Sequence, residues 1–201
     1  MKVLVLYYST FGNVYEMAKL VAEGARSEGA EPVIRTVPEL MPEAVIEGNE
    51  GMKRGRAMQR DVPLVNNDDI RQAGAVALGT PTRFGNMAAQ LKNQIDQLSE
   101  LWLKGELEDK PVGMFVSTAS LHGGQETTIL ASLAPLLHLG MIPVGVPYSV
   151  QELFTTQGGG SPYGPGHVAG GDNTRGIDDQ EAAICRALGA RLARVGATLQ
   201  S

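Results

Sequence analysis

The sequence is poor in the residue types that form disulfides and metal sites. It holds one cysteine, Cys185, and three histidines in 201 residues. One cysteine excludes an intrachain disulfide, and the widely spaced histidines show no ligand pattern, so we expect no metal. Because its neighbours suggest a helix face, Cys185 is interpreted as a small buried hydrophobe rather than as a catalytic thiol.

Long hydrophobic runs and an excess of positive charge are also lacking. No segment approaches the ~20 apolar residues that a membrane span requires, and the apolar run at 2–8 does not resemble a signal peptide. We therefore expect a cytoplasmic protein without a membrane span. The 17 Lys and Arg residues against 22 Asp and Glu argue against nucleic acid as a main partner. One local basic cluster is interpreted as a solvated loop: Lys53, Arg54, Arg56 and Arg60.

Five hydrophobic segments alternate with helical patterns along the whole chain. The segment at 2–8 lacks period-two alternation, which predicts a central strand covered on both faces. The last helix begins at a capping pair, Asp178 and Glu181. The expected strands are residues 2–8, 32–37, 76–81, 112–118 and 141–146, and the main expected helices are 14–25, 88–102, 125–139 and 178–199.

This alternation predicts an α/β fold of one domain, residues 1–201, with a doubly wound five-stranded parallel sheet. We expect the flavodoxin-like strand order 2-1-3-4-5, with irregular insertions at about 38–68 and 147–176. A Rossmann order is the competitor. It is less favoured because its dinucleotide site requires G-x-G-x-x-G, whereas the loop after the first strand has only Gly12.

The 25 glycines and 11 prolines gather after the expected strands and at 157–176, which indicates close approach of backbone to a ligand. In such a sheet, ligands bind at the carboxyl ends of strands. The loop Ser9–Val14 combines hydroxyls with a helix N-terminus but has no Lys or Arg. It therefore suits the single phosphate of FMN better than a triphosphate, although an ordinary helix cap would have the same pattern.

Two further loops, Thr80–Asn86 and Ser117–Gly124, end the third and fourth strands. Their small polar residues and glycines could bring backbone N–H groups to a flavin edge. Arg83 could meet the phosphates of a nicotinamide cofactor or a neighbouring subunit, or it could be solvated. Taken alone, His138 is interpreted as a helix-end residue and Trp102 as a core residue.

Several of these strings together resemble one family, the tetrameric WrbA-type NAD(P)H:quinone oxidoreductases of the flavodoxin-like superfamily. The resemblance covers nearly the whole chain, and the string at 79–87 and the string at 122–126 are its most specific parts. The matching stretches are residues 3–9, 79–87 (G-T-P-T-R-F-G-N-M), 117–120, 122–126 (H-G-G-Q-E), 151–154, 163–164 and 169–172.

The resemblance implies an FMN enzyme that reduces quinones by two electrons with NADH or NADPH, through ping-pong hydride transfer, as a homotetramer. It implies His138 as the catalytic flavin-site histidine, supplied to a site formed by more than one subunit. Phe11, where the family often has tyrosine, and Trp102 would contact substrate. The implied cofactor-binding residues are Ser9, Thr10, Phe11, Gly12, Asn13, Val14, Thr82, Arg83, Phe84, Ser117, Thr118, Ala119, Ser120, Leu121, His122 and His138.

Three alternatives stay open at this point. A flavodoxin-type one-electron carrier would bind FMN but would not need NAD(P)H, although it would have little use for the segments 38–68 and 147–176. A related reductase of azo or nitro compounds would use the same two-electron chemistry. A regulatory or structural partner is the third alternative. The acidic charge balance gives no support for direct contact of such a partner with DNA.

Overall fold

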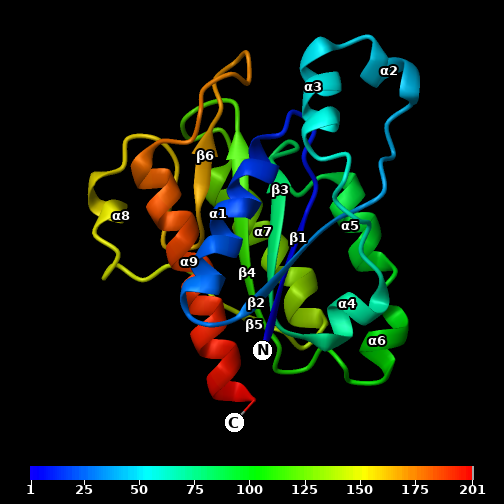
Figure 1. Cartoon of the computed structure of the whole chain (residues 1–201), viewed down its shortest axis with the longest axis vertical. Helices are drawn as coiled ribbons and strands as arrows, with labels where there is room; N and C mark the ends of the chain where they lie inside the picture. Colours follow the sequence, from blue (N-terminus) through cyan, green and yellow to red (C-terminus); the bar gives the residue numbers. More distant parts are fainter. Residues whose placement is uncertain (201) are drawn as a thin grey trace.

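Six parallel strands form one sheet in the computed structural model, which describes residues 1–200 (Figure 1). The order of the first five is β2-β1-β3-β4-β5, which confirms the predicted flavodoxin-like order, and β6 pairs with β4. The strands are β1 Lys2–Tyr7, β2 Glu31–Thr36, β3 Ala73–Pro81, β4 Pro111–Thr118, β5 Ile142–Pro143 and β6 Gly166–Val168.

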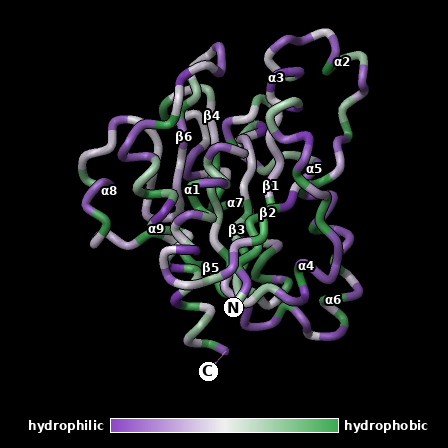
Figure 2. Tube along the Cα trace, in the orientation of Figure 1, coloured by the Kyte–Doolittle hydropathy of each residue, from purple (hydrophilic) through white to green (hydrophobic). Residues whose placement is uncertain are grey.

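Helices cover both faces of this sheet, and they bury nearly every residue of the central strands. Leu4 and Leu6 of β1 face one core cluster, whereas Val5 and Tyr7 face the other. In Figure 2 the hydrophobic colour lies mainly in the interior around the sheet. The loop beyond β6 and the segment around α2 and α3 are mostly hydrophilic. Helices α1 (Asn13–Ser27) and α9 (Asp179–Leu199) cover the second face, and α5 (Ala89–Asp96), α6 (Ser99–Leu103) and α7 (Gln125–His138) cover the first.

The predicted fifth strand at 141–146 is wrong in its length. Only β5 pairs with the start of β4, and the chain leaves the sheet after Val144. Proline has no N–H to donate to the next strand, and both Pro143 and Pro147 lie in this segment. The short helix α8 (Glu152–Thr155) follows, and β6 then pairs with the end of β4. One sheet position is therefore filled by two separate strands.

Two helical predictions also need correction. The expected helix 88–102 is two helices, because Gln97 and Leu98 donate to carbonyls only three residues back and so tighten the turn between them. The segment 38–68 contains α2 (Glu43–Glu47), α3 (Glu50–Met58) and the start of α4 (Asn67–Gln72). The basic cluster, interpreted as a solvated loop, lies mainly on α3, which stands above the carboxyl edge of the sheet (Figure 1).

A buried ion network ties β6 to the start of α9. Glu181 and His167 are fully buried, and His167 Nδ1 lies 3.0 Å from Glu181 Oε2. Arg175 donates to both carboxylate oxygens at 2.9 and 3.0 Å. Asp178 and Glu181 form the predicted capping box. Burial would raise the pKa of Glu181, but hydrogen bonds from His167 and Arg175 outweigh it and lower that pKa to about 2.

Two further predictions concern the burial of Cys185 and the absence of a membrane span. Cys185 is fully buried on the inner face of α9, as expected, and burial raises the pKa of its thiol. Within residues 1–200, no helix is both long and apolar enough to cross a membrane.

Candidate functional site

Three loops at the carboxyl edge of the sheet enclose one polar cavity of about 240 Å³, here called the loop cavity. It lies after β1, β3 and β4, as expected for a parallel sheet whose strand order reverses there. The lining residues are Ser9, Thr10, Phe11, Asn13, Val14, Pro81, Thr82, Arg83, Ser117, Thr118, Ala119 and Asn173. Ten of the residues predicted to bind the cofactor therefore come together in space.

The loop after β1 offers backbone donors to this cavity. Gly12 has a φ of 94°, a left-handed conformation that suits glycine, and its N–H donates to Ser9 Oγ at 3.1 Å. The N–H groups of Thr10 and Phe11 have no acceptor within residues 1–200. The first turn of α1 adds further unpaired N–H groups and the positive end of its dipole. These neutral donors fit a singly phosphorylated cofactor such as FMN.

The loops after β3 and β4 are joined by short hydrogen bonds. The Thr82 N–H donates to Ser117 O at 2.9 Å, and the Thr82 hydroxyl lies 2.7 Å from the Thr128 hydroxyl on α7. Arg83 reaches across the cavity, and its Nη2 donates to Thr10 Oγ1 at 2.7 Å. The three loops are thus connected before any ligand binds.

Several predicted residues lie outside the loop cavity of this chain. Phe84, with a φ of 53°, is at the tip of a tight turn and fully exposed, and Ser120, Leu121 and His122 are exposed beyond the cavity. His138 is exposed at the end of the 14-residue helix α7, about 20 Å from the end that adjoins the cavity.

Trp102 also lies away from the cavity, on α6 near the opposite end of the sheet (Figure 1). Its side chain is 52% exposed, so the interpretation of Trp102 as a core residue is wrong. The neighbouring Leu103 is 77% exposed. These two side chains form an apolar surface that the chain itself does not cover.

Sequence reasoning missed Asn173, which lines the loop cavity with a φ of 59°. Its loop follows β6, and Arg175 holds that loop by donating to Val168 O at 2.8 Å and to Glu181. The glycine-rich string at 169–172 was the available signal, but it indicates this edge of the sheet only once β6 is known as a strand.

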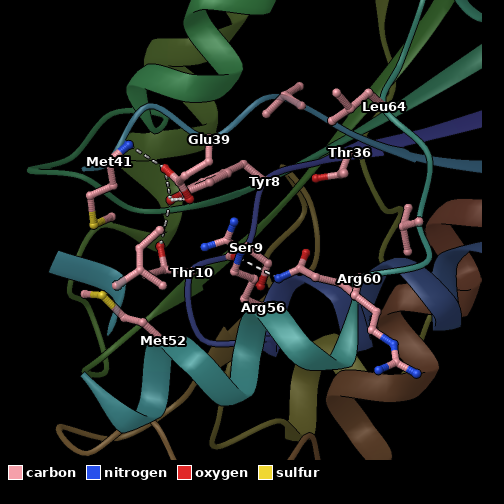
Figure 3. Close-up of a pocket in the computed structure, with 14 residues that line it drawn as sticks. Tyr8, Ser9, Thr10, Thr36, Glu39, Met41, Met52, Arg56, Arg60 and Leu64 are labelled. Atoms are coloured by element: carbon pink, nitrogen blue, oxygen red, sulfur yellow. Dashed lines mark hydrogen bonds between the residues drawn. The ribbon is translucent and has the colours of Figure 1, made fainter. Parts of the chain in front are cut away.

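The loop Ser9–Val14 is here called the phosphate-type loop. A second cavity of about 280 Å³ lies on its other side, and we call it the tyrosine cavity (Figure 3). Tyr8 donates to Glu39 at 2.9 Å, and Thr10 donates to Tyr8 at 3.4 Å. Because Arg83 donates to Thr10, a chain of hydrogen bonds connects the two cavities. Gln90 donates a further hydrogen bond of 2.7 Å to Glu39.

Burial and hydrogen-bond donors determine the charge states of Tyr8 and Glu39. Burial raises the pKa of Tyr8 to about 12, so the phenol stays protonated and donates. Burial would raise the pKa of Glu39 as well, but hydrogen bonds from the Met41 N–H, Gln90 and Tyr8 outweigh it and lower that pKa. Glu39 is therefore an ionised anchor for the segment that leads into α2.

The sheet order and the polar cavity at its carboxyl edge define a flavodoxin-like protein with a phosphate-binding type of loop. The chain belongs to the NADPH-dependent FMN reductase family, whose sequence model matches residues 1–155. Its relatives include a protein of Trichlorobacter lovleyi, 46% identical over 98% of each chain, and one of Aromatoleum aromaticum, 43% identical over 99% of this chain and 97% of the relative. Both relatives are named NAD(P)H dehydrogenase (quinone).

A solved structure shows the same fold. The WrbA-like flavodoxin of Agrobacterium tumefaciens superposes with a TM-score of 0.68 over 98% of each chain, at 23% identity. Together with the family match, these similarities confirm the predicted resemblance, the oxidoreductase class, and FMN with NAD(P)H as cofactors.

Proposed function

We propose that this chain reduces quinones by two electrons with NADH or NADPH, in a ping-pong order in which the nicotinamide leaves before the quinone binds. The observation that carries the proposal is the loop cavity, where donors from three loops converge in a member of an FMN reductase family. The quinone is proposed from the names of the curated relatives. When bound, FMN would supply the redox chemistry, and the protein would position it.

The residues of the chain have separate roles in this proposal. Ser9 to Val14 hold the phosphate through hydroxyls and N–H groups, and these donors are all neutral. Thr82, Arg83 and Phe84 and the loop Ser117 to His122 border the flavin ring. Because the loops after β3 and β4 are already hydrogen-bonded to each other, little ordering is required on binding.

We further propose a homotetramer, in which His138 and Trp102 complete the loop cavity of another subunit beside Phe11. Their position far from the cavity of their own chain, and the exposure of Trp102 and Leu103, support this assembly. The whole chain, 1–201, would act as one FMN-binding domain with insertions at about 38–68 and 147–176, and its location would be cytoplasmic.

Stopped-flow reduction of the FMN-loaded protein by NADH and by NADPH, followed by benzoquinone, tests the central proposal. We expect rapid, complete bleaching of the flavin absorbance and its recovery with quinone. A flavin that binds but is reduced by neither nicotinamide would favour the alternative, a flavodoxin-type one-electron carrier. Failure to bind FMN would contradict both.

Replacing His138 with Ala should slow quinone turnover about 100-fold, because an imidazole at the site can protonate the product. FMN should stay bound, since His138 is about 20 Å from the end of α7 that adjoins the loop cavity of its own chain. The measurement is kcat with saturating FMN for the wild type, His138→Ala and His138→Gln, together with the sedimentation coefficient of each. Glutamine keeps hydrogen bonding but carries no exchangeable charge. An unchanged kcat in tetrameric His138→Ala would disprove the role.

A further inference from the structure

One cation beside the loop cavity is left without a partner. On and just after α3, Lys53 pairs with Glu50 at 3.1 Å, Arg56 with Glu43 at 2.5 Å, and Arg60 approaches Asp61 at 3.5 Å. Arg54 has neither an ion pair nor a hydrogen bond within residues 1–200. Its guanidinium is free to meet an external anion.

Arg54 lines a groove of about 480 Å³ between α3 and the loop after β6, here called the arginine groove. Phe11, Asn13 and Asn173 line both this groove and the loop cavity. The two spaces therefore adjoin at the phosphate-type loop. A ligand that contacts a cofactor in the loop cavity can extend into the arginine groove without crossing the protein.

Of the residues that line the loop cavity, Arg83 alone carries a positive charge. Ser9 to Val14 contain no Lys or Arg. Arg83 is already bonded to Thr10 Oγ1 and to Thr82 O, at 2.7 and 2.9 Å. A second anionic group placed here would be repelled by a bound phosphate, unless a cation stood beside it. Arg54 is the cation in that position.

The opposite wall of the groove presents a carboxylate. Asp172 accepts hydrogen bonds from the Thr174 hydroxyl at 2.7 Å and from the Thr174 N–H at 3.2 Å, and these bonds lower the pKa of Asp172. It is therefore ionised at neutral pH and can accept hydrogen bonds from the hydroxyls of a ribose, as acidic residues do in dinucleotide sites. A guanidinium and a carboxylate that line one groove suit a ligand in which a phosphate is joined to a ribose.

We propose that the arginine groove binds the ribose-diphosphate part of the nicotinamide cofactor, with Arg54 on a phosphate and Asp172 on a ribose diol. This inference rests on the proposed function, because it assigns a place to the electron donor of that reaction. Arg54 then serves the dinucleotide and not FMN, since FMN phosphate already has the donors of the loop and of α1.

Calorimetric titration of the FMN-loaded protein with ADP-ribose tests this assignment without turnover. The Kd should rise about tenfold in Arg54→Gln, in line with loss of one charge-assisted hydrogen bond. The matched control is Arg56→Gln, which removes the same charge from the same helix and should leave the Kd within about twofold. Asp172→Asn should also raise the Kd for ADP-ribose. The Kd for FMN should not change in any variant.

Each other outcome overturns the inference. The inference fails if the wild type does not bind ADP-ribose or if Arg54→Gln leaves its Kd unchanged. It also fails if the Kd rises equally in Arg56→Gln, or if Arg54→Gln raises the Kd for FMN. Reduction of the wild type by NADH and NADPH, measured separately, reports on the proposed function. If the wild type is reduced but Arg54→Gln binds ADP-ribose normally, only the groove assignment fails.

Discussion

Replacing Glu181 with Gln is expected to lower the free energy of unfolding by about 3–5 kcal/mol, the cost of breaking a buried ion pair from one side. Glu181 is fully buried, and it accepts hydrogen bonds from Arg175, His167 and three backbone N–H groups. Glutamine has no charge, and its amide nitrogen would face donors where an oxygen now accepts. Urea unfolding at pH 7 measures the loss.

The same network predicts how stability depends on pH. The folded pKa of Glu181, about 2, lies below the ordinary value of 4.5. Its contribution to stability, about 3 kcal/mol, is therefore present above pH 4.5 and is lost as the pH falls through about 2. In the Glu181→Gln variant this part of the acid dependence should disappear, so the curves of wild type and variant should approach each other at low pH.

An exposed ion pair that joins α9 to α1 provides the control. Arg186 pairs with Glu23 at 2.9 Å, and both side chains are about half exposed. Glu23→Gln should cost less than about 1 kcal/mol, because solvent screens such pairs. A loss for Glu181→Gln that is no greater than the loss for Glu23→Gln would show that the buried network does not stabilise the fold.

Two parts of the fold show what local sequence patterns can and cannot predict. The strand order follows from the alternation of strands and helices, because right-handed crossovers leave few arrangements. The capping pair Asp178 and Glu181 is likewise a local signal. The partnership of Glu181 with His167 is not, because it depends on β6 pairing with β4, and pairing of distant segments leaves no periodicity in the sequence.

The candidate site also has one part that sequence patterns predict and one part that they do not. The loops after β1, β3 and β4 could be predicted to meet, because carboxyl ends of parallel strands share an edge. The helix that carries Arg54 could not be placed, because Gly55 is the one residue of α3 that is buried. Such a helix has no apolar stripe to mark its inner face, and a glycine contact rather than side-chain burial holds it against the loop.

Gly55→Ala is expected to weaken FMN binding about tenfold and to lower the free energy of unfolding by about 1–3 kcal/mol, the usual cost of overpacking. Helix propensity alone predicts the opposite sign, a gain of about 1 kcal/mol for alanine over glycine. A Cβ at Gly55 would lie 2.6 Å from Thr10 O and from the carbonyl carbon of Phe11. These are backbone atoms of the phosphate-type loop, and they cannot rotate away.

The helix or the loop must therefore move by about 0.8 Å to restore an ordinary contact of 3.4 Å. Such a shift would also disturb the hydrogen bond of 2.8 Å from Gln59 Nε2 to Ser9 O, which holds the same loop from behind. Fluorescence titration of FMN and urea unfolding measure the two effects.

Gly51→Ala is the matched control on the same helix. Its Cβ would lie 3.1 Å from the ring of Phe11, and a side chain can move aside where backbone cannot. FMN affinity in this variant should stay within about twofold, because only the Phe11 ring has to move and the N–H groups and hydroxyls proposed to hold the phosphate keep their positions. If Gly55→Ala is as stable as helix propensity alone implies and binds FMN like Gly51→Ala, then α3 does not support the loop, and the neutral donors of the loop hold their positions without it.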